Sequence, residues 1–203
     1  FVWTNEDLKT FQGVYQGNHH VISGALFCGS SAGLISSLEG AVVNLRMEHC
    51  ASIAKTLCQA IVVGESSGTV SNCSVSDSIV VSADTNAYTG AIVGLAKLNS
   101  VISYNTSENN RIMNDGNAAG GIVGQSDVSV RDCLVNGGDV SGEESTGGIV
   151  GTVTNSAEGI CIHGCQSSAN ISGKYHIGGI CGYYVQYTFC LLYTSDAADE
   201  ARS

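Results

Sequence analysis

The chain of 203 residues has no proline and little charge: 13% of its residues are charged, with eight lysines and arginines against 18 acids. The resulting net charge of -10 argues against nucleic acid as a partner, because phosphate binding requires clustered basic side chains. The shortage of cations also disfavours an anionic membrane surface. No apolar run approaches the roughly 20 residues that a membrane-spanning helix needs. Low charge also disfavours disorder, which combines high charge with low hydrophobicity.

Glycine, in contrast, is abundant at 26 residues and recurs in a regular motif. Short boxes of glycine, alanine, isoleucine and valine end at Gly64, Gly94, Gly124, Gly151 and Gly182, so successive copies are 30, 30, 27 and 31 residues apart. The isoleucines of these boxes are Ile61, Ile92, Ile122, Ile149 and Ile180. A period near 30 residues over five copies is typical of a stacked repeat array. We expect the paired glycines where the chain bends tightly or adopts a positive φ.

A second strand is expected about eight residues after each box. Its apolar residues are Val70, Ile102, Val130 and Ile162, and three residues later the copies carry Cys73, Asn105, Cys133 and Cys165. Strict alternation cannot place both Val70 and Cys73 inside, so we predict a bend at Asn72. The copy Ile102-Ser103-Tyr104-Asn105 is the variant one. A third strand follows near residues 79–81, 111–113, 139–141 and 170–172.

These observations predict an all-β fold: a single-stranded right-handed parallel β-helix (β-solenoid) with about 30 residues and three short strands per coil. Like strands would stack about 4.8 Å apart. The repeats would occupy residues 24–188. Residues 1–23 would form an N-terminal cap, with a helical turn at residues 4–9 and a hairpin that turns at Gly17-Asn18. Such a cap would cover the backbone edge of the first coil.

The last residues need a separate interpretation. Residues 190–200 match translated sequencing-adapter DNA, so we treat residues 189–203 as a non-native tail. On this interpretation the source is metagenomic DNA, the sequence is a fragment, and the natural protein continues beyond residue 189. The alternative is a polar helical tail.

The boxes resemble the GLUG motif, a glycine-rich repeat written around G-G-[IL]-V-G and a following [IV]-x-N-C. Phe11 to Ile22 is similar to the F-x-G-x-[YF]-x-G-N-x-H-x-I opening of such arrays. The resemblance covers residues 8–188, and Ala60 and Ala91 depart from it by replacing a glycine. It implies a secreted or cell-surface protein of Gram-positive and gut bacteria, as in adhesin-like proteins and IgA-specific metallopeptidases. The family has no assigned catalytic residues, so the resemblance implies none here.

The candidate chemistry lies mainly in the cysteines. The column of Cys73, Cys133 and Cys165, with Asn105 between the first two, is interpreted as a buried thiol ladder, and the alternative is redox or disulfide chemistry between coils. Cys161, His163 and Cys165, with His176 and Cys181 nearby, lack the spacing of a zinc site. We expect no metal and no cofactor.

A carbohydrate-active β-helix enzyme would need acids converging from several coils. Asp127, Asp132 and Asp139 lie within one coil, and we expect Arg111 and Arg131 to be too isolated to form a cleft with them. We therefore expect a non-catalytic repeat segment of a larger exported surface protein, acting as a rigid spacer or as an adhesion surface toward an extracellular protein or glycan. The alternatives are a fragment of a carbohydrate-active β-helix enzyme and an accessory region of a surface metallopeptidase.

Overall fold

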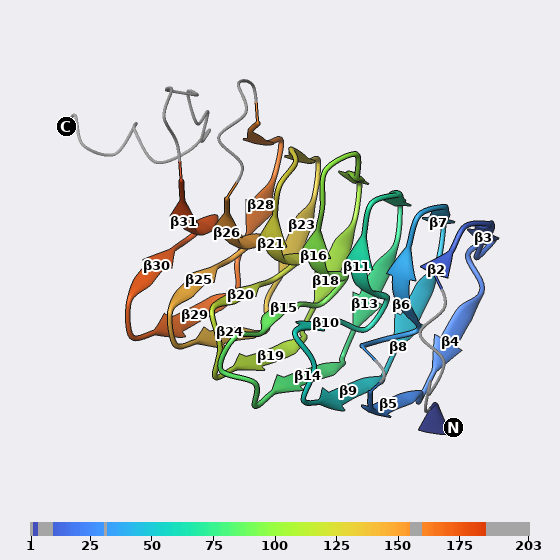
Figure 1. The fold of residues 1–203 in the computed structure, drawn as a ribbon, viewed down its shortest axis with the longest axis horizontal. Coiled ribbons are helices and arrows are strands. Elements are labelled where there is room, and N and C mark those ends of the chain that lie inside the picture. The colour runs from blue at the N-terminus through green and yellow to red at the C-terminus, as the bar shows by residue number, and fades with distance from the viewer. Residues whose placement is uncertain (1, 4–9, 31, 155–159, 186–203) are drawn as a thin grey trace.

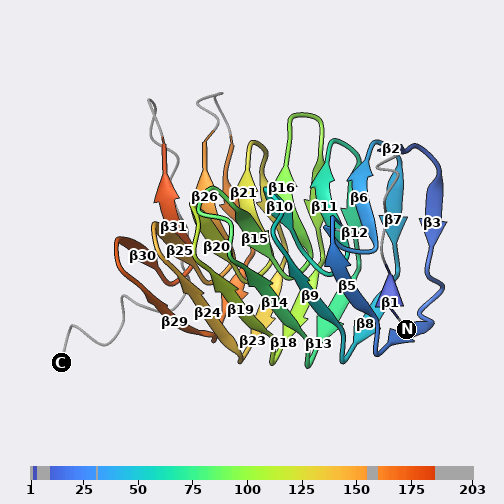
Figure 2. The same cartoon turned by 60° about the horizontal axis from the view of Figure 1, so that its bottom comes forward.

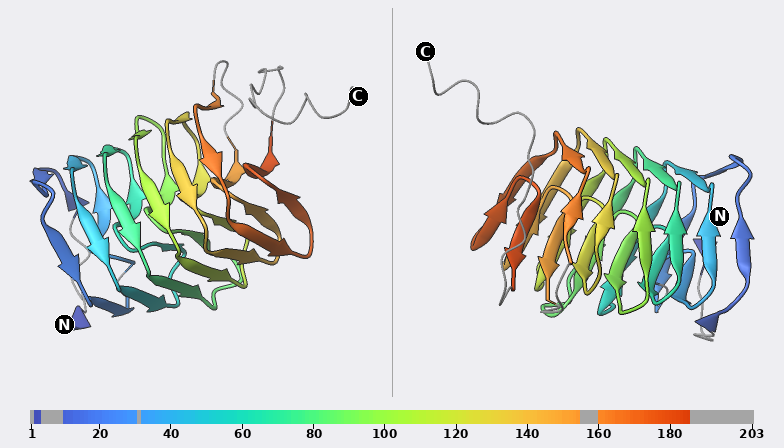
Figure 3. Two further views of the ribbon diagram at one scale, coloured as in Figure 1. Left: turned by 180° about the vertical axis from the view of Figure 1, so that it is seen from behind. Right: turned by 90° about the horizontal axis from the view of Figure 1, so that it is seen from above.

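The computed structural model describes residues 2–3, 10–30, 32–154 and 160–185, and these residues form a parallel β-solenoid in which no helix occurs. Parallel strands stack in about six turns of about 28 residues each. Figure 1 shows the turns side by side, from the blue N-terminal coil to the red coil at the other end. Figures 2 and 3 show from further sides that the strand ladders follow one common axis. The predicted fold class is confirmed.

A full coil contributes one strand to each of five sheets, numbered here in the order in which the chain visits them. Sheet I consists of β2 (Thr10–Phe11), β6 (Ile35–Leu38), β11 (Val63–Ser66), β16 (Val93–Ala96), β21 (Val123–Ser126), β26 (Val150–Val153) and β31 (Cys181–Tyr184). Sheet II consists of β3 (Val14–Gln16), β7 (Ala41–Val43), β12 (Thr69–Ser71), β17 (Val101–Ser103), β22 (Val130–Arg131) and β27 (Ile162–His163). Sheet III consists of β4 (Val21–Ser23), β8 (Arg46–Glu48), β13 (Ser74–Ser76), β18 (Thr106–Glu108), β23 (Leu134–Asn136) and β28 (Gln166–Ser167).

The remaining two sheets close the coil. Sheet IV consists of β1 (Val2–Trp3), β5 (Leu26–Gly29), β9 (Ala51–Ala54), β14 (Ile79–Ser82), β19 (Arg111–Asn114), β24 (Asp139–Gly142) and β29 (Asn170–Gly173). Sheet V consists of β10 (Cys58–Gln59), β15 (Tyr88–Gly90), β20 (Ala118–Gly120), β25 (Ser145–Gly147) and β30 (His176–Gly178). The three strands predicted for each coil correspond to sheets I, II and IV. The prediction of three strands per coil is therefore wrong. A full coil has five strands, and those of sheets III and V were not predicted.

The bend predicted at Asn72 is confirmed. Asn72 separates β12 from β13 and has a φ of 53°, in the left-handed region that asparagine tolerates well. Val70 before the bend and Cys73 after it are both buried. A second left-handed corner follows five residues later, at Asp77 with a φ of 48°. Except in the last described coil, which has one such corner at Gly164, two of them turn the chain from sheet II through sheet III into sheet IV.

The core is a set of apolar columns inside the tube. In sheet II, Val42 pairs with Val70, Val70 with Ile102, and Val130 with Ile162, so equivalent side chains stack on successive coils as predicted. The predicted third strand shows the same register, since Val80 pairs with Ile112. Full burial of each such side chain contributes roughly 1.5–3 kcal/mol. The stack is therefore held together mainly by contacts between neighbouring coils.

The closing glycines of the boxes lie in one column of sheet I, as expected. None of them has a positive φ, so that part of the expectation is wrong. They are needed for space instead: a Cβ on Gly94 would lie 2.5 Å from the backbone nitrogen of Gln59, and one on Gly124 would lie 2.3 Å from that of Thr89. At these glycines sheet I therefore approaches the backbone of sheet V too closely for a side chain.

The isoleucines of the boxes form a column that is buried except at Ile180, which is half-buried, and the predicted column needs one correction. Val63 pairs with Val93, which places Val62 level with Ile92 and Ile61 level with Ala91. Ile61 is buried, but it is one position out of the column that Ile92 begins. That column continues through Ile122, Ile149 and Ile180.

The predicted N-terminal hairpin is wrong. β3 and β4, on either side of Gly17-Asn18, do not pair with each other; β3 pairs in parallel with β7, and β4 pairs in parallel with β8. The segment is thus the first coil of the solenoid, and its partners lie one turn further along the chain. The expected helical turn at residues 4–9 and the tail at residues 189–203 lie outside the described residues.

Candidate functional site

The predicted cysteine column lies directly after the first corner of each coil. Cys73, Asn105 and Cys133 are buried there, and Cys165 in a later coil is half-buried. A side chain on one coil accepts a hydrogen bond from a backbone N–H of the coil before it. The Cys73 N–H donates to Asn105 Oδ1 at 3.0 Å, and the Cys133 N–H donates to Cys165 Sγ at 3.4 Å. The column therefore has a structural role, because its side chains hydrogen-bond the backbone N–H that follows the corner of the neighbouring coil.

The thiols of this column differ in acidity because their surroundings differ. Burial raises the pKa of Cys73 to about 11. The hydrogen bond between Cys133 and Cys165 raises the pKa of Cys133, and burial raises it further, whereas the same bond lowers the pKa of Cys165. All eight cysteines in the described part of the chain are free thiols.

The residues considered for a metal site face different ways. Cys161 is half-buried, His163 is exposed, and the Cys165 thiol donates to the Val130 carbonyl oxygen at 3.6 Å. His176 packs its ring against Tyr183, with ring centroids 4.5 Å apart. Among the described residues, no group of three or more histidine, cysteine or acidic side chains is placed to hold a metal ion.

The three aspartates of one coil are spread over different walls. Asp127 follows sheet I and accepts a hydrogen bond from the Thr154 hydroxyl at 2.5 Å. Asp139 lies in sheet IV and accepts one from Asn170 Nδ2 at 3.1 Å. Asp132 occupies the first corner, at the end of sheet II. These three carboxylates therefore do not converge on a common point.

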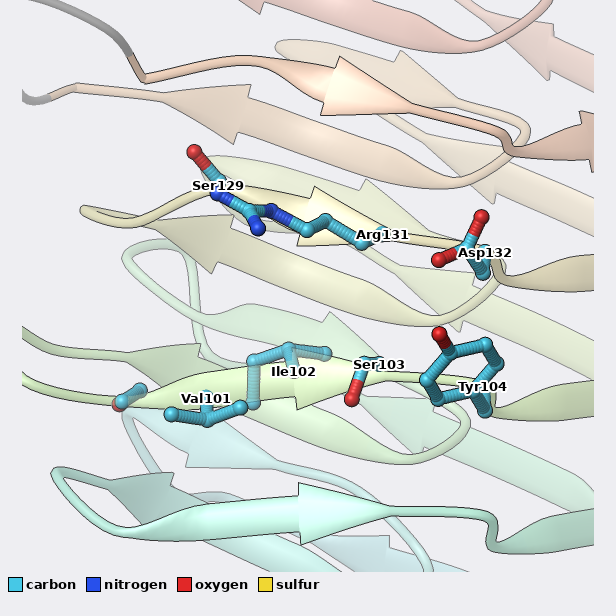
Figure 4. A pocket seen from close by; sticks show the side chains of 8 residues that line it. Val101, Ile102, Ser103, Tyr104, Ser129, Arg131 and Asp132 are labelled. Atoms are coloured by element: carbon cyan, nitrogen blue, oxygen red, sulfur yellow. The ribbon is translucent and has the colours of Figure 1, made fainter.

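A concave surface lies on the outer face of sheet II, between β17 and β22 (Figure 4). This β17–β22 cavity has a volume of about 470 Å³ and is lined by Ser100, Val101, Ile102, Ser103, Tyr104, Ser129, Arg131 and Asp132. In Figure 4, Tyr104 and Asp132 face each other at one end of the two strands, and the Arg131 side chain runs back along β22 toward Ser129. Arg131 and Asp132 thus share a cavity, so the expectation that Arg131 forms no cleft with the aspartates is wrong for Asp132, whereas Asp127 and Asp139 do not line this cavity.

Some polar side chains of the cavity are hydrogen-bonded within the protein, and others are available to a ligand. The Ser103 hydroxyl bonds to the Ser71 hydroxyl at 3.1 Å, and the Ser100 hydroxyl donates to the Ser66 carbonyl at 2.6 Å. No side-chain hydrogen bond or ion pair within the described chain engages Tyr104, Arg131 or Asp132. Those three groups face solvent together.

Tyr104 has a backbone conformation that its residue type disfavours. Its φ is 57°, and the other described non-glycine residues with positive φ are all asparagine, aspartate or histidine. A residue such as tyrosine in the left-handed region costs about 1–3 kcal/mol. It also interrupts the corner ladder, in which Asn72 Nδ2 donates to Asn44 Oδ1 at 2.5 Å. The ring gains little burial in return, since Tyr104 is 61% exposed.

The neighbouring coil leaves room for the Asp132 carboxylate. Gly164 follows Asp132 in the corner column, and a Cβ on Gly164 would lie 2.2 Å from Asp132 Oδ1. The absence of a side chain at that point allows the carboxylate to keep its orientation. Sequence reasoning marked the copy around Tyr104 as a variant but did not identify it as a site. The usable signal was an aromatic residue where the other copies have asparagine, aspartate or glycine.

A second concave surface lies between sheets V and I. It has a volume of about 340 Å³ and is lined by Tyr88, Asn117, Gln125, Glu144, Ser145, Thr152, His176 and Tyr183. Gln125 Nε2 donates to Thr154 Oγ1 at 3.2 Å, and Asn117 Nδ2 donates to the Asn86 carbonyl at 3.3 Å. Both amides are therefore already engaged in holding neighbouring coils together.

Comparison of the chain with models of known protein families, with curated proteins and with solved structures finds no match. In the described ranges, no helix has the length and apolar character that crossing a membrane would require.

Proposed function

We propose that this chain is a non-catalytic segment of a larger exported bacterial surface protein and that it acts as a rigid spacer with an adhesive surface. The observation that supports this most directly is the continuous register of the sheets. Val63 pairs with Val93, Val93 with Val123, and Val123 with Val150, so each added coil lengthens the same rod. Repetition suits a spacer, because each coil needs only its neighbours for stability.

The export and surface location in this proposal rest on the resemblance of the glycine boxes and the opening segment to the GLUG motif. The adhesive role is supported by the β17–β22 cavity, where Tyr104, Arg131 and Asp132 face solvent on a wall held by stacked strands. A non-catalytic role is supported by the separation of Asp127, Asp132 and Asp139, because glycoside hydrolysis requires two carboxyl groups that flank one bond.

The spacer role can be tested by lengthening the array. Gly90 pairs with Gly120, so residues 90–119 make up one complete coil that can be duplicated in tandem. Small-angle X-ray scattering should show a maximum dimension that grows by about 4.8 Å for each added coil. A Gly/Ser insert of the same length is the control, and it should split the array into two loosely connected bodies. A duplicated coil that behaves like the Gly/Ser insert would contradict a rigid spacer.

The non-catalytic part of the proposal has its own test. The protein is incubated with plant and bacterial polysaccharides, and newly formed reducing ends and unsaturated products are measured. We expect no release above that of heat-denatured protein. Release of either product would instead support the carbohydrate-active β-helix enzyme.

A further inference from the structure

We infer that the β17–β22 cavity binds a neutral saccharide through Tyr104, Arg131 and Asp132. This inference rests on the proposed adhesive function and adds the site and the chemical class of the ligand. The three side chains come from two successive coils, Tyr104 from the end of β17 and the other two from β22 and its corner. They form a common surface only because the coils stack in register.

The charges of the cavity select the kind of ligand. Arg131 can only donate hydrogen bonds, whereas an ionised Asp132 can only accept them. For an anion, the attraction of Arg131 is opposed by Asp132 and by the net charge of -10, and for a cation the attraction of Asp132 is opposed by the adjacent Arg131. An apolar ligand would remove both charges from water without replacing their hydrogen bonds. A hydroxyl group both donates and accepts, so a neutral polyol can satisfy the two side chains at once.

The aromatic ring adds an apolar surface beside these polar groups. Tyrosine offers a large, rigid and amphipathic contact area at low cost in conformational entropy. The C–H face of a sugar ring can pack against such a ring while its hydroxyls reach Arg131 and Asp132. Val101, which is 50% exposed, extends the apolar surface along β17. A saccharide therefore uses both kinds of surface that the cavity presents.

The unfavourable conformation of Tyr104 points to a role outside the fold. Asn72 occupies the equivalent corner of the preceding coil, where it joins the amide ladder. Tyr104 keeps the same left-handed φ without that ladder and with most of its ring in solvent. Residues with strained backbone conformations cluster at binding sites, where the strained side chain contacts a ligand and contributes little to the stability of the fold.

The size of the cavity favours a small ligand over a protein partner. Its volume of about 470 Å³ is within the range of about 300–1,000 Å³ for small-molecule sites. A standard protein interface buries about 800 Å² and 20–30 residues on each partner, far more than this cavity provides.

The test uses the full chain and calorimetric titration with neutral oligosaccharides of glucose, galactose, mannose and N-acetylglucosamine. We expect at least one to bind, and an oligomer of galacturonic acid to bind at least tenfold more weakly. Tyr104→Asn should weaken binding at least tenfold and should also raise the thermal midpoint of unfolding, because asparagine suits the corner. Asp132→Asn should weaken binding without changing the fold.

Tyr175→Asn is the matched control, since Tyr175 is 59% exposed and does not line the cavity. This variant should bind as the wild type does. The inference is overturned by the absence of binding to every neutral oligosaccharide, by preference for the acidic one, or by unchanged binding in Tyr104→Asn. The scattering experiment on duplicated coils is independent of all these results, so a failure of this site is distinguishable from a failure of the spacer role.

Discussion

Asn105 hydrogen-bonds the backbone on both sides of the corner that precedes Cys73 on the neighbouring coil. Its Oδ1 accepts from the Cys73 N–H at 3.0 Å, and its Nδ2 donates to the Val70 carbonyl at 2.9 Å. Asn110 repeats the arrangement at the second corner, where it accepts from the Ser78 N–H at 2.8 Å and donates to the Val75 carbonyl at 2.8 Å. Coils are thus joined by side chains at the corners as well as by strand ladders.

Replacing Asn105 with alanine should destabilise the solenoid by about 2–5 kcal/mol, because a buried N–H and a buried carbonyl each lose their partner. Urea denaturation followed by circular dichroism measures this change. Asn136→Ala is the control, since the Asn136 side chain is exposed, and it should change the unfolding free energy by less than about 0.5 kcal/mol. Equal losses in the two variants would contradict the corner role of Asn105.

Gly148 and Gly179 are the second glycines of their boxes, and they should differ in their tolerance of alanine because a further described coil covers only Gly148. A Cβ on Gly148 would lie 2.1 Å from the Gly179 carbonyl oxygen, whereas one on Gly179 meets nothing within 4 Å. We expect Gly148→Ala to cost about 2–3 kcal/mol or more through overpacking. Gly179→Ala should be neutral or slightly stabilising, because it reduces the entropy of the unfolded chain. Thermal unfolding of the two variants side by side tests this, and similar midpoints would contradict close packing between coils.

The buried hydroxyl of Thr89 has no hydrogen-bond partner, and that of Thr146 has none either. Replacing each threonine with valine keeps its shape and removes an unsatisfied polar atom, so each change should stabilise by about 1 kcal/mol. Ser78→Ala is the opposite case, because the Ser78 hydroxyl accepts from the Cys50 N–H at 2.9 Å and donates to the Ser76 carbonyl at 2.7 Å. Denaturant midpoints should rise for the valine variants and fall for Ser78→Ala.

Alkaline pH should destabilise the protein through its buried thiols. The pKa of Cys73 is about 11 in the folded chain, against 9.0 for an ordinary thiol. The unfolded chain therefore loses this proton first, so the contribution of the thiol is complete below pH 9 and is lost as the pH rises toward 11. The loss is about 1.4 kcal/mol for each pH unit in that window. The unfolding free energy of Cys73→Ala should fall less steeply with pH than that of the wild type.

The two thiols of the Cys133–Cys165 pair should react at different rates. The hydrogen bond from Cys133 lowers the pKa of Cys165, and Cys165 is half-buried, whereas Cys133 is buried with a raised pKa. Because the thiolate is the reactive form, iodoacetamide at pH 8 should modify Cys165 well before Cys133. Peptide mass spectrometry over time measures both sites. Cys133→Ala should slow the modification of Cys165, and an unchanged rate would show that the bond does not govern its reactivity.

The repeat and most of its register could be predicted from the sequence, because identical requirements recur on every coil. The spacing of the boxes identified the glycine column, and the alignment of Val70 with Ile102 identified an interior column that the structure confirms. The bend at Asn72 followed from a conflict between two apolar residues three positions apart. Each of these predictions requires only that one copy of the repeat is aligned with the next.

The features that the sequence did not predict depend on contacts between coils, which the sequence of one repeat copy does not show. Gly17-Asn18 has the local chemistry of a hairpin turn, yet the flanking strands pair with residues 25 or more positions further along the chain. Sheets III and V were not predicted because their strands are only two or three residues long, too short for a visible alternation, and lack the recurring apolar residue and following cysteine that marked the equally short strands of sheet II. The predicted register of Ile61 was wrong because Ile61 and Val62 are both apolar, so the sequence alone does not show which of them is level with Ile92.

By itself, the sequence determined that this chain winds into a parallel solenoid, because a fixed period with alternating apolar residues can bury them only by stacking one coil on the next. Only the tertiary structure decided where that rod is hollowed and which side chains meet there. Tyr104 and Arg131 are 27 residues apart in the sequence and become neighbours through the pitch of the coil. Their shared cavity is a property of the stack, which the repeat period alone could not locate.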